Sequence, residues 1–177
     1  MPDADPAHFP PNPAVRVRRA TVRDLAALID LENATFTHDR MSPRQWRRHL
    51  HNDRAALLVA VHGNDLAGAA VVFFRRRAAV ARLYSIAVAQ AQRGRGIGRL
   101  LLAAAEAETV RRGRRALRLE VRAGNASAQR TYEAAGYARF GAIPDYYEDG
   151  EAAWRYQKPL AAADVRRKTA AISPVRS

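Results

Sequence analysis

The 177-residue sequence has no cysteine, only two lysines and no apolar run of the roughly 18 residues that a membrane helix needs. Without cysteine the chain cannot form a disulfide framework, a thiolate zinc site or a cysteine nucleophile. Residues 1–14 are acidic and proline-rich where a secretory signal would be basic and apolar. We therefore expect a cytoplasmic protein with no membrane segment, whose length suits one domain with its own core.

The charge is strongly one-sided, because 30 Lys and Arg against 17 Asp and Glu give a net charge of +13. Residues 1–14 carry −2 and residues 161–177 carry +3, which leaves +12 on residues 15–160. A basic body attracts anionic ligands, nucleic acid included. An arginine excess of this kind also follows from genome composition, so both explanations stay open.

Apolar periodicity is confined to residues 15–160, which we predict to be the folded domain. Residues 1–14 hold five prolines and predict a disordered tail, and residues 161–177 predict a basic flexible tail. Inside the domain, capping boxes at Thr21 and Ser42 each predict the start of a helix.

The remaining elements follow from alternation, caps and turn residues. Predicted strands are 15–20, 55–61, 66–74, 80–88, 116–123, 137–142 and 152–160, and predicted helices are 21–34, one from 42, one ending near 112, and 125–136. The third helix is predicted to bury Leu100, Leu101, Ala104 and Ala107 and to end at Gly113. The order β-α-α-β-β-β-α-β-α-β-β predicts an α/β fold with a largely antiparallel start and a central β-α-β crossover.

Residues 92–102, QRGRGIGRLLL, gather three glycines and three arginines where a helix is about to begin. Unpaired N–H groups at the positive end of a helix dipole form an anion site, glycines allow close approach, and arginines add charge-assisted hydrogen bonds. The loop lacks the Lys-Ser/Thr of a Walker motif, and its glycine spacing is wrong for a dinucleotide fingerprint. A polyphosphate site is favoured over a plain structural loop.

Two motifs resemble the GNAT acetyltransferases. Residues 93–98 match the Arg/Gln-x-x-Gly-x-Gly/Ala pyrophosphate loop of that family, and they follow a strand, LYSIAV, of the kind that precedes the loop there. Residues 125–137 match the second signature, Asn-x-x-Ala-x-x-x-Tyr-x-x-x-Gly-Phe/Tyr. The resemblance covers residues 15–160 and implies the GNAT fold, with a mixed, mostly antiparallel sheet of about seven strands and about four helices.

Within that family, the segments LEVRAGN and DYYEDGEAAWRYQKPL resemble most the ribosomal-protein alanine (RimI-type) and protein Nα-acetyltransferase branch. The resemblance implies that an acetyl group moves from acetyl-CoA to a primary amine by direct attack, without a metal. The implied residues for acetyl-CoA, the co-substrate, are Ile86, Ala87, Val88, Arg93, Gly94, Arg95, Gly96, Ile97, Gly98, Arg99 and Asn125. For Asn125 a helix N-cap role, alone or in addition, stays open.

Two residues are candidates for proton transfer. Alternation puts Glu120 on the polar face of its strand with Arg118 and Arg122. Its place in the motif implies a general base, acting directly or through water, and the alternative is an inert ion pair with those arginines. The resemblance makes Tyr132 the acid that protonates the CoA thiolate, and the alternative is a core aromatic with a satisfied hydroxyl.

Phe36, Tyr146 and Tyr147 lie in segments that border the acceptor groove in peptide-acetylating relatives, although they could equally anchor loops. The five histidines have no metal-ligand spacing, so no metal site is expected. The acceptor is expected to be a protein N-terminal amine, with a lysine side chain or a small amine as alternatives. A body of +12 disfavours strongly basic protein substrates.

Two alternative functions, neither of them acetyl transfer, stay open. Runs of arginine such as residues 75–77 could bind nucleic acid, but no recognition motif accompanies them. The chain could also be a silent acetyl-CoA sensor. We expect a monomer or a homodimer that binds acetyl-CoA and an amine, and no membrane.

Overall fold

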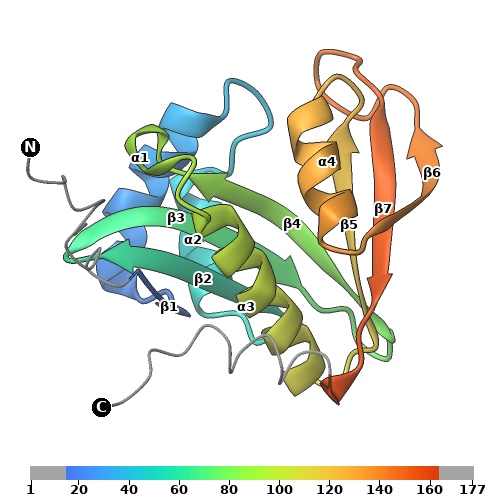
Figure 1. Cartoon of the computed structure of the whole chain (residues 1–177). Helices are drawn as coiled ribbons and strands as arrows, with labels where there is room; N and C mark the ends of the chain where they lie inside the picture. The colour runs from blue at the N-terminus through green and yellow to red at the C-terminus, as the bar shows by residue number, and fades with distance from the viewer. Residues whose placement is uncertain (1–14, 164–177) are drawn as a thin grey trace, which may run out of the picture.

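The computed structural model describes residues 15–163 (Figure 1). Our predictions for the two tails therefore lie outside the described residues, apart from 161–163. The elements are β1 (Arg16–Arg19), the 3-10 turn η1 (Val22–Asp24), α1 (Leu25–Thr35), α2 (Pro43–Leu50), β2 (Ala55–His62), β3 (Asp65–Phe73), β4 (Val80–Val88), the 3-10 turn η2 (Gln90–Gln92), α3 (Ile97–Arg111), β5 (Ala116–Arg122), α4 (Ala126–Ala134), β6 (Ala138–Ile143) and β7 (Ala153–Pro159).

The strands form one seven-stranded sheet in the order β1-β2-β3-β4-β5-β7-β6. Every neighbouring pair is antiparallel except β4 with β5, which α3 joins in parallel as a β-α-β crossover. The predicted α/β fold is confirmed, and each predicted strand ends within one residue of the observed one. The first predicted helix is divided into η1 and α1.

The sheet opens in its middle, between β4 and β5. These strands pair only from Val80 to Arg82 with Ala116 to Arg118. Beyond that point β4 pairs with β3 alone and β5 with β7 alone, and Figure 1 shows the two strands separating. An irregularity in the β3–β4 register leaves Tyr84 without a partner, and such a bulge bends its strand. We call the opening beyond Arg82 and Arg118 the fork.

Two cores lie on the two faces of the sheet. Side chains of α3 and α4 pack on one face, and in Figure 1 α3 crosses the strands β2 to β4 while α4 stands beside β5 and β7. Side chains of α1 and α2 pack on the other face over β2, β3 and β4, around Trp46, whose side chain is 2% exposed.

The buried face of α3 differs from the predicted one. Leu101 is buried as expected, but Leu100, Ala104 and Ala107 are only partly buried. The buried apolar residues are Ile97, Leu101, Leu102 and Ala105. Because leucine and alanine occur on all sides of this helix, apolar periodicity alone does not fix which side faces the sheet.

Gly68 of β3 allows α3 to lie close to the sheet. A Cβ at this position would lie 2.7 Å from the carbonyl oxygen of Ala87 and 3.0 Å from Cδ1 of Leu101. The neighbouring atoms belong to backbone and to a fully buried side chain, so they have little room to move.

We expect Gly68→Ala to lower the free energy of unfolding by about 1–3 kcal/mol through overpacking. Gly141→Ala is the matched control, because the nearest atom to its added Cβ lies 4.0 Å away. Urea unfolding measures both variants. Equal midpoints for Gly68→Ala and Gly141→Ala would show that α3 does not depend on this close approach.

Candidate active site

The glycine loop connects β4 to α3 through η2. Gly94 and Gly96 both have φ of +76°, and Gly96 is the left-handed N-cap of α3. A Cβ on either glycine would meet nothing within 4 Å, so the requirement for glycine here comes from the backbone conformation. The N–H groups of residues 94–99 donate to no acceptor within residues 15–163. The loop therefore presents a set of unused donors at the positive end of α3.

The arginines of this loop, Arg93, Arg95 and Arg99, are exposed. Arg93 Nε donates to the carbonyl oxygen of Val88 over 3.4 Å, and Arg95 Nη1 donates to Gln92 Oε1 over 3.2 Å. No carboxylate of the described chain forms an ion pair with these three arginines. The loop is thus positively charged and able to hold a polyphosphate.

The free edge of β4 continues from this loop along the fork. Ile86, Ala87 and Val88 pair with Ala70, Ala69 and Gly68 of β3, which leaves their other edge without a strand partner. Asn125 lies at the end of β5 and caps α4, because its Oδ1 accepts from the N–H of Ala128 over 3.0 Å. The predicted cap role of Asn125 is confirmed, and a role in binding a ligand stays a prediction.

Glu120 lies two residues beyond the last β4–β5 pair, and its side chain is 8% exposed. Its Oε2 accepts a hydrogen bond of 2.8 Å from Arg82 Nε, and its Oε1 lies 3.9 Å from Arg155 Nε. The alternative of an ion pair is realised with Arg82 and Arg155, and Arg118 and Arg122 form no ion pair with Glu120. Same-face residues on one strand are about 7 Å apart, whereas Arg155 lies directly opposite Glu120 on β7.

Arg82 connects Glu120 to the loop between β6 and β7, and our sequence analysis missed it. Its Nη2 donates to the Tyr146 hydroxyl, and its Cζ lies 5.5 Å from the centroid of the Tyr84 ring. Burial raises the pKa of Tyr146 above its usual value. A sequence signal existed, because Arg82 is a charged residue in the otherwise apolar strand VARLYSIAV. Its partner across the fork, Glu120, depends on the strand register, which the sequence alone does not show.

Tyr147 lies beside Tyr146, with ring centroids 4.9 Å apart and an interplanar angle of 88°. Arg122 Cζ stands 3.9 Å from the centroid of the Tyr147 ring. Burial raises the pKa of Tyr147 to about 12, and the phenol of Tyr146 contributes in the same direction. Arg82 bonds to both Glu120 and Tyr146, and Tyr147 lies against Tyr146, so the structure brings these three predicted residues into one cluster.

Arg122 joins the two loops that border this cluster. Its Nη1 lies 2.7 Å from Asp149 and 2.8 Å from Glu151, and its Nη2 lies 3.5 Å from Asp39. The segment after α1 is thereby tied to the segment before β7. Phe36, the third predicted acceptor residue, packs half-buried against the core under α1 and α2, and its role in the acceptor site stays a prediction.

Tyr132 lies on α4 and packs in the core that α3 and α4 form on one face of the sheet. Its side chain is 8% exposed and meets the Tyr137 ring edge-on, with centroids 5.8 Å apart. Burial raises the pKa of Tyr132, and the nearby phenol of Tyr147 raises it further. Its hydroxyl makes no hydrogen bond with any residue from 15 to 163. The ring is part of the core, but the hydroxyl keeps an available proton.

A family model described as "Acetyltransferase (GNAT) domain" matches residues 22–160. The chain belongs to the GNAT acetyltransferase family. A search of curated protein sequences found no match. The fork and the glycine loop thus lie inside the acetyltransferase domain.

Solved structures resemble this GNAT acetyltransferase over most of its length. The ribosomal-protein-S18-alanine N-acetyltransferase from Escherichia coli is 27% identical, covering 83% of this chain and 94% of that chain with a TM-score of 0.74. The ribosomal-protein-alanine N-acetyltransferase from Brucella melitensis is 28% identical, covering 82% and 99% with a TM-score of 0.71. Nourseothricin acetyltransferase is 26% identical, covering 84% and 99% with a TM-score of 0.69.

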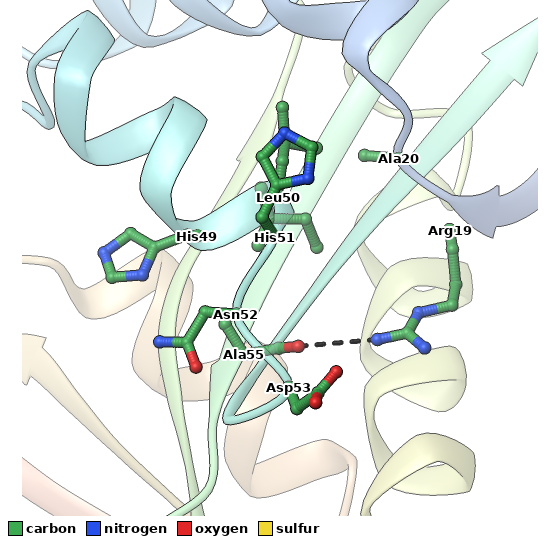
Figure 2. Close-up of a pocket in the computed structure, with 9 residues that line it drawn as sticks. Arg19, Ala20, His49, Leu50, His51, Asn52, Asp53 and Ala55 are labelled. Atoms are coloured by element: carbon green, nitrogen blue, oxygen red, sulfur yellow. Dashed lines mark hydrogen bonds between the residues drawn. The ribbon is translucent and has the colours of Figure 1, made fainter.

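A separate hollow of about 290 Å³ lies away from the fork of this acetyltransferase (Figure 2). It is lined by the end of β1, the end of α2 and the start of β2, and Arg19 Nη2 donates to the carbonyl oxygen of Ala55 across it over 3.4 Å. Residues 15–163 contain no group of three His, Cys, Asp or Glu side chains that could hold a metal. Nor is any helix in this range both long and apolar enough to cross a bilayer.

Proposed function

We propose that this GNAT acetyltransferase transfers the acetyl group of acetyl-CoA to the α-amine of a peptide N-terminus. The observation that carries the proposal is the fork, with the Glu120 carboxylate on β5 just beyond the last β4–β5 pair and the glycine loop after the end of β4. Two structural neighbours above 25% identity are named for acetylation of a ribosomal-protein alanine, which supports a peptide acceptor.

The residues fit acetyl-CoA as a substrate. The unused N–H groups of residues 94–99 and the arginines beside them suit the diphosphate. The unpaired edge of Ile86–Val88 suits the amide groups of pantetheine, which would extend β4 as a strand does. Asn125 follows β5, the strand on the other side of the fork, by three residues.

Glu120 is proposed as the general base. Its Oε2 is held by Arg82, whereas Oε1 has only Arg155 at 3.9 Å, so Oε1 is the oxygen that can accept a proton. The amine nitrogen forms a bond to the acetyl carbonyl carbon and gives up its proton to Oε1, directly or through one water molecule. Arg82 is a positioning residue, since one guanidinium orients both Glu120 and Tyr146.

Tyr132 is proposed as the general acid. As the carbon–sulfur bond breaks, the electron pair stays on sulfur, and the phenol donates its proton to the thiolate. The raised pKa of Tyr132 keeps that proton in place until the thiolate forms. The proton taken up by Glu120 returns to solvent, and the phenolate of Tyr132 is reprotonated from solvent before the next turnover.

Thiol release with a panel of amines tests the acceptor. We expect the highest kcat/KM with peptides that carry a free N-terminus, compared with N-terminally blocked lysine peptides, polyamines and aminoglycosides. Release only with lysine or with small amines would contradict the peptide acceptor, and release with none would indicate a silent sensor.

Calorimetry with acetyl-CoA tests the glycine loop separately. Gly96→Val places a β-branched residue at φ of +76°, and we expect it to weaken binding about tenfold because that conformation strains the loop. Gly63→Val is the matched control, since Gly63 has φ of +63° in the β2–β3 turn. Equal loss of affinity in both variants would point to general destabilisation and not to a diphosphate site.

A further inference from the structure

Among residues 15–163, no helix packs against one face of the part of the sheet formed by β5, β7 and β6. Side chains of α4, including Tyr132, join the core on the opposite face. The core under α1 and α2 contains residues of β2, β3 and β4 but none of β5, β6 or β7. We call the side chains of Arg118, Phe140, Arg155 and Gln157 on this uncovered side the arginine face.

Phe140 is the centre of the arginine face, and its side chain is 46% exposed. Arg118 Cζ lies 4.7 Å and Arg155 Cζ lies 4.8 Å from the centroid of its ring. A cation–π contact fixes a guanidinium in place without cancelling its charge. The two arginines are therefore held side by side on one aromatic ring.

These guanidiniums have few acceptors among the described residues. Arg118 donates through Nε and Nη2 to the neutral Oε1 of Gln157, over 3.1 and 2.7 Å, and forms no ion pair within residues 15–163. The buried Nε of Arg155 has no hydrogen-bond partner, and its one carboxylate neighbour is Glu120 at 3.9 Å. Arg122, by contrast, is surrounded by three carboxylates. The arginine face keeps a net positive charge.

This charge lies beside the proposed catalytic base. Arg155 is directly opposite Glu120 in the β5–β7 register, and Arg118 precedes Glu120 by two residues on the same face of β5. An extended peptide advances about 3.3 Å per residue. If its terminal amine lies at Glu120, the second and third residues of the peptide lie within about 7 Å of Glu120. The side chains of Arg155 and Arg118 can reach over that distance.

We propose that the arginine face selects acceptor peptides that carry Asp or Glu at their second or third residue. The inference rests on the proposed function and names its substrate class. Carboxylates complement the guanidinium of Arg118, which forms no ion pair within residues 15–163, and a lysine at the same place meets like charge.

Three peptides with the same first residue and the same length test the selection: Ala-Asp-Asp, Ala-Ser-Ser and Ala-Lys-Lys, each followed by one neutral sequence. At low ionic strength we expect kcat/KM to fall in that order, with about a tenfold gap between the acidic and the lysine peptide. The gap should narrow at about 0.5 M salt, because exposed charges are screened. Equal kcat/KM for the three peptides would overturn the inference but not the acetyltransferase activity.

Charge-changing variants locate the effect. Arg118→Glu should reverse the preference toward the lysine peptide, and Arg118→Gln, the milder change, should remove most of it. Arg23→Glu is the matched control, because Arg23 is exposed in η1 beside β1, at the opposite edge of the sheet from β6. The same loss of preference in Arg23→Glu would attribute it to net charge and overturn the assignment. No thiol release with any amine would instead contradict the proposed function.

Discussion

Replacing Tyr132 with phenylalanine is expected to lower kcat by about 10²–10³-fold, the range for loss of a general acid. The change removes one oxygen atom from a ring that stays in its packed position against Tyr137. Because the Tyr132 hydroxyl has no hydrogen-bond partner in residues 15–163, its loss should leave the free energy of unfolding within about 0.5 kcal/mol of the parent value. The Kd for acetyl-CoA should change little.

Tyr137→Phe is the matched control, since both rings lie in the same core. The Tyr137 hydroxyl donates to the buried carboxylate of Glu106 over 3.2 Å. Losing that bond should cost about 1–3 kcal/mol in urea unfolding while kcat stays near the parent value. Tyr132→Phe should therefore lower turnover and leave stability unchanged, whereas Tyr137→Phe should lower stability and leave turnover unchanged. An unchanged kcat for Tyr132→Phe, measured by thiol release, would show that Tyr132 is not the general acid.

Local signals in the sequence predicted most of the fold. Ser42 accepts from the Gln45 amide as the capping box indicated, and Gly113 has φ of +71° at the end of α3 as its position suggested. Caps and strand alternation are properties of neighbouring residues, so a single sequence carries them. The glycine loop was predictable for the same reason, because its strand, turn and helix start follow each other directly in the sequence.

The site depended on register, which local signals do not contain. The pairing of Glu120 with Arg82 and Arg155 follows from which strands lie side by side and from where β4 and β5 part. Phe36 was assigned to the acceptor site by its segment alone, and that role stays a prediction; its contact with the core under α1 and α2 follows from tertiary packing. Contacts of long sequence separation were thus the ones that the sequence analysis missed.

Lys158→Met is expected to lower the free energy of unfolding by about 3–5 kcal/mol, the usual cost of removing one partner from a buried ion pair. The side chain of Glu106 is 3% exposed, and Lys158 Nζ lies 2.7 Å from its Oε1. Without the ammonium, the buried carboxylate loses this ion pair while the cost of removing it from water remains. Urea unfolding at pH 7 measures the loss.

A double-mutant cycle with Glu106→Gln distinguishes the ion pair from lost packing. If the charge causes the loss, the double variant should be more stable than Lys158→Met alone, since a neutral amide then replaces the buried carboxylate. Arg111→Met is the control on the same helix, because Arg111 is 62% exposed in its pair with Glu108 and should cost less than about 1 kcal/mol. A double variant no more stable than Lys158→Met would assign the effect to packing.

This ion pair also connects the two sides of the fork. Glu106 lies on α3, whose first turn carries the glycine loop, and Lys158 lies on β7, which pairs with β5 along its length and holds Arg155 opposite Glu120. Breaking the pair should therefore loosen the placement of Glu120 relative to the loop. We therefore expect Lys158→Met to lower kcat/KM more than Gly68→Ala does. Thiol release measures the difference, with each variant assayed equally far below its own unfolding midpoint so that the remaining stabilities are equal.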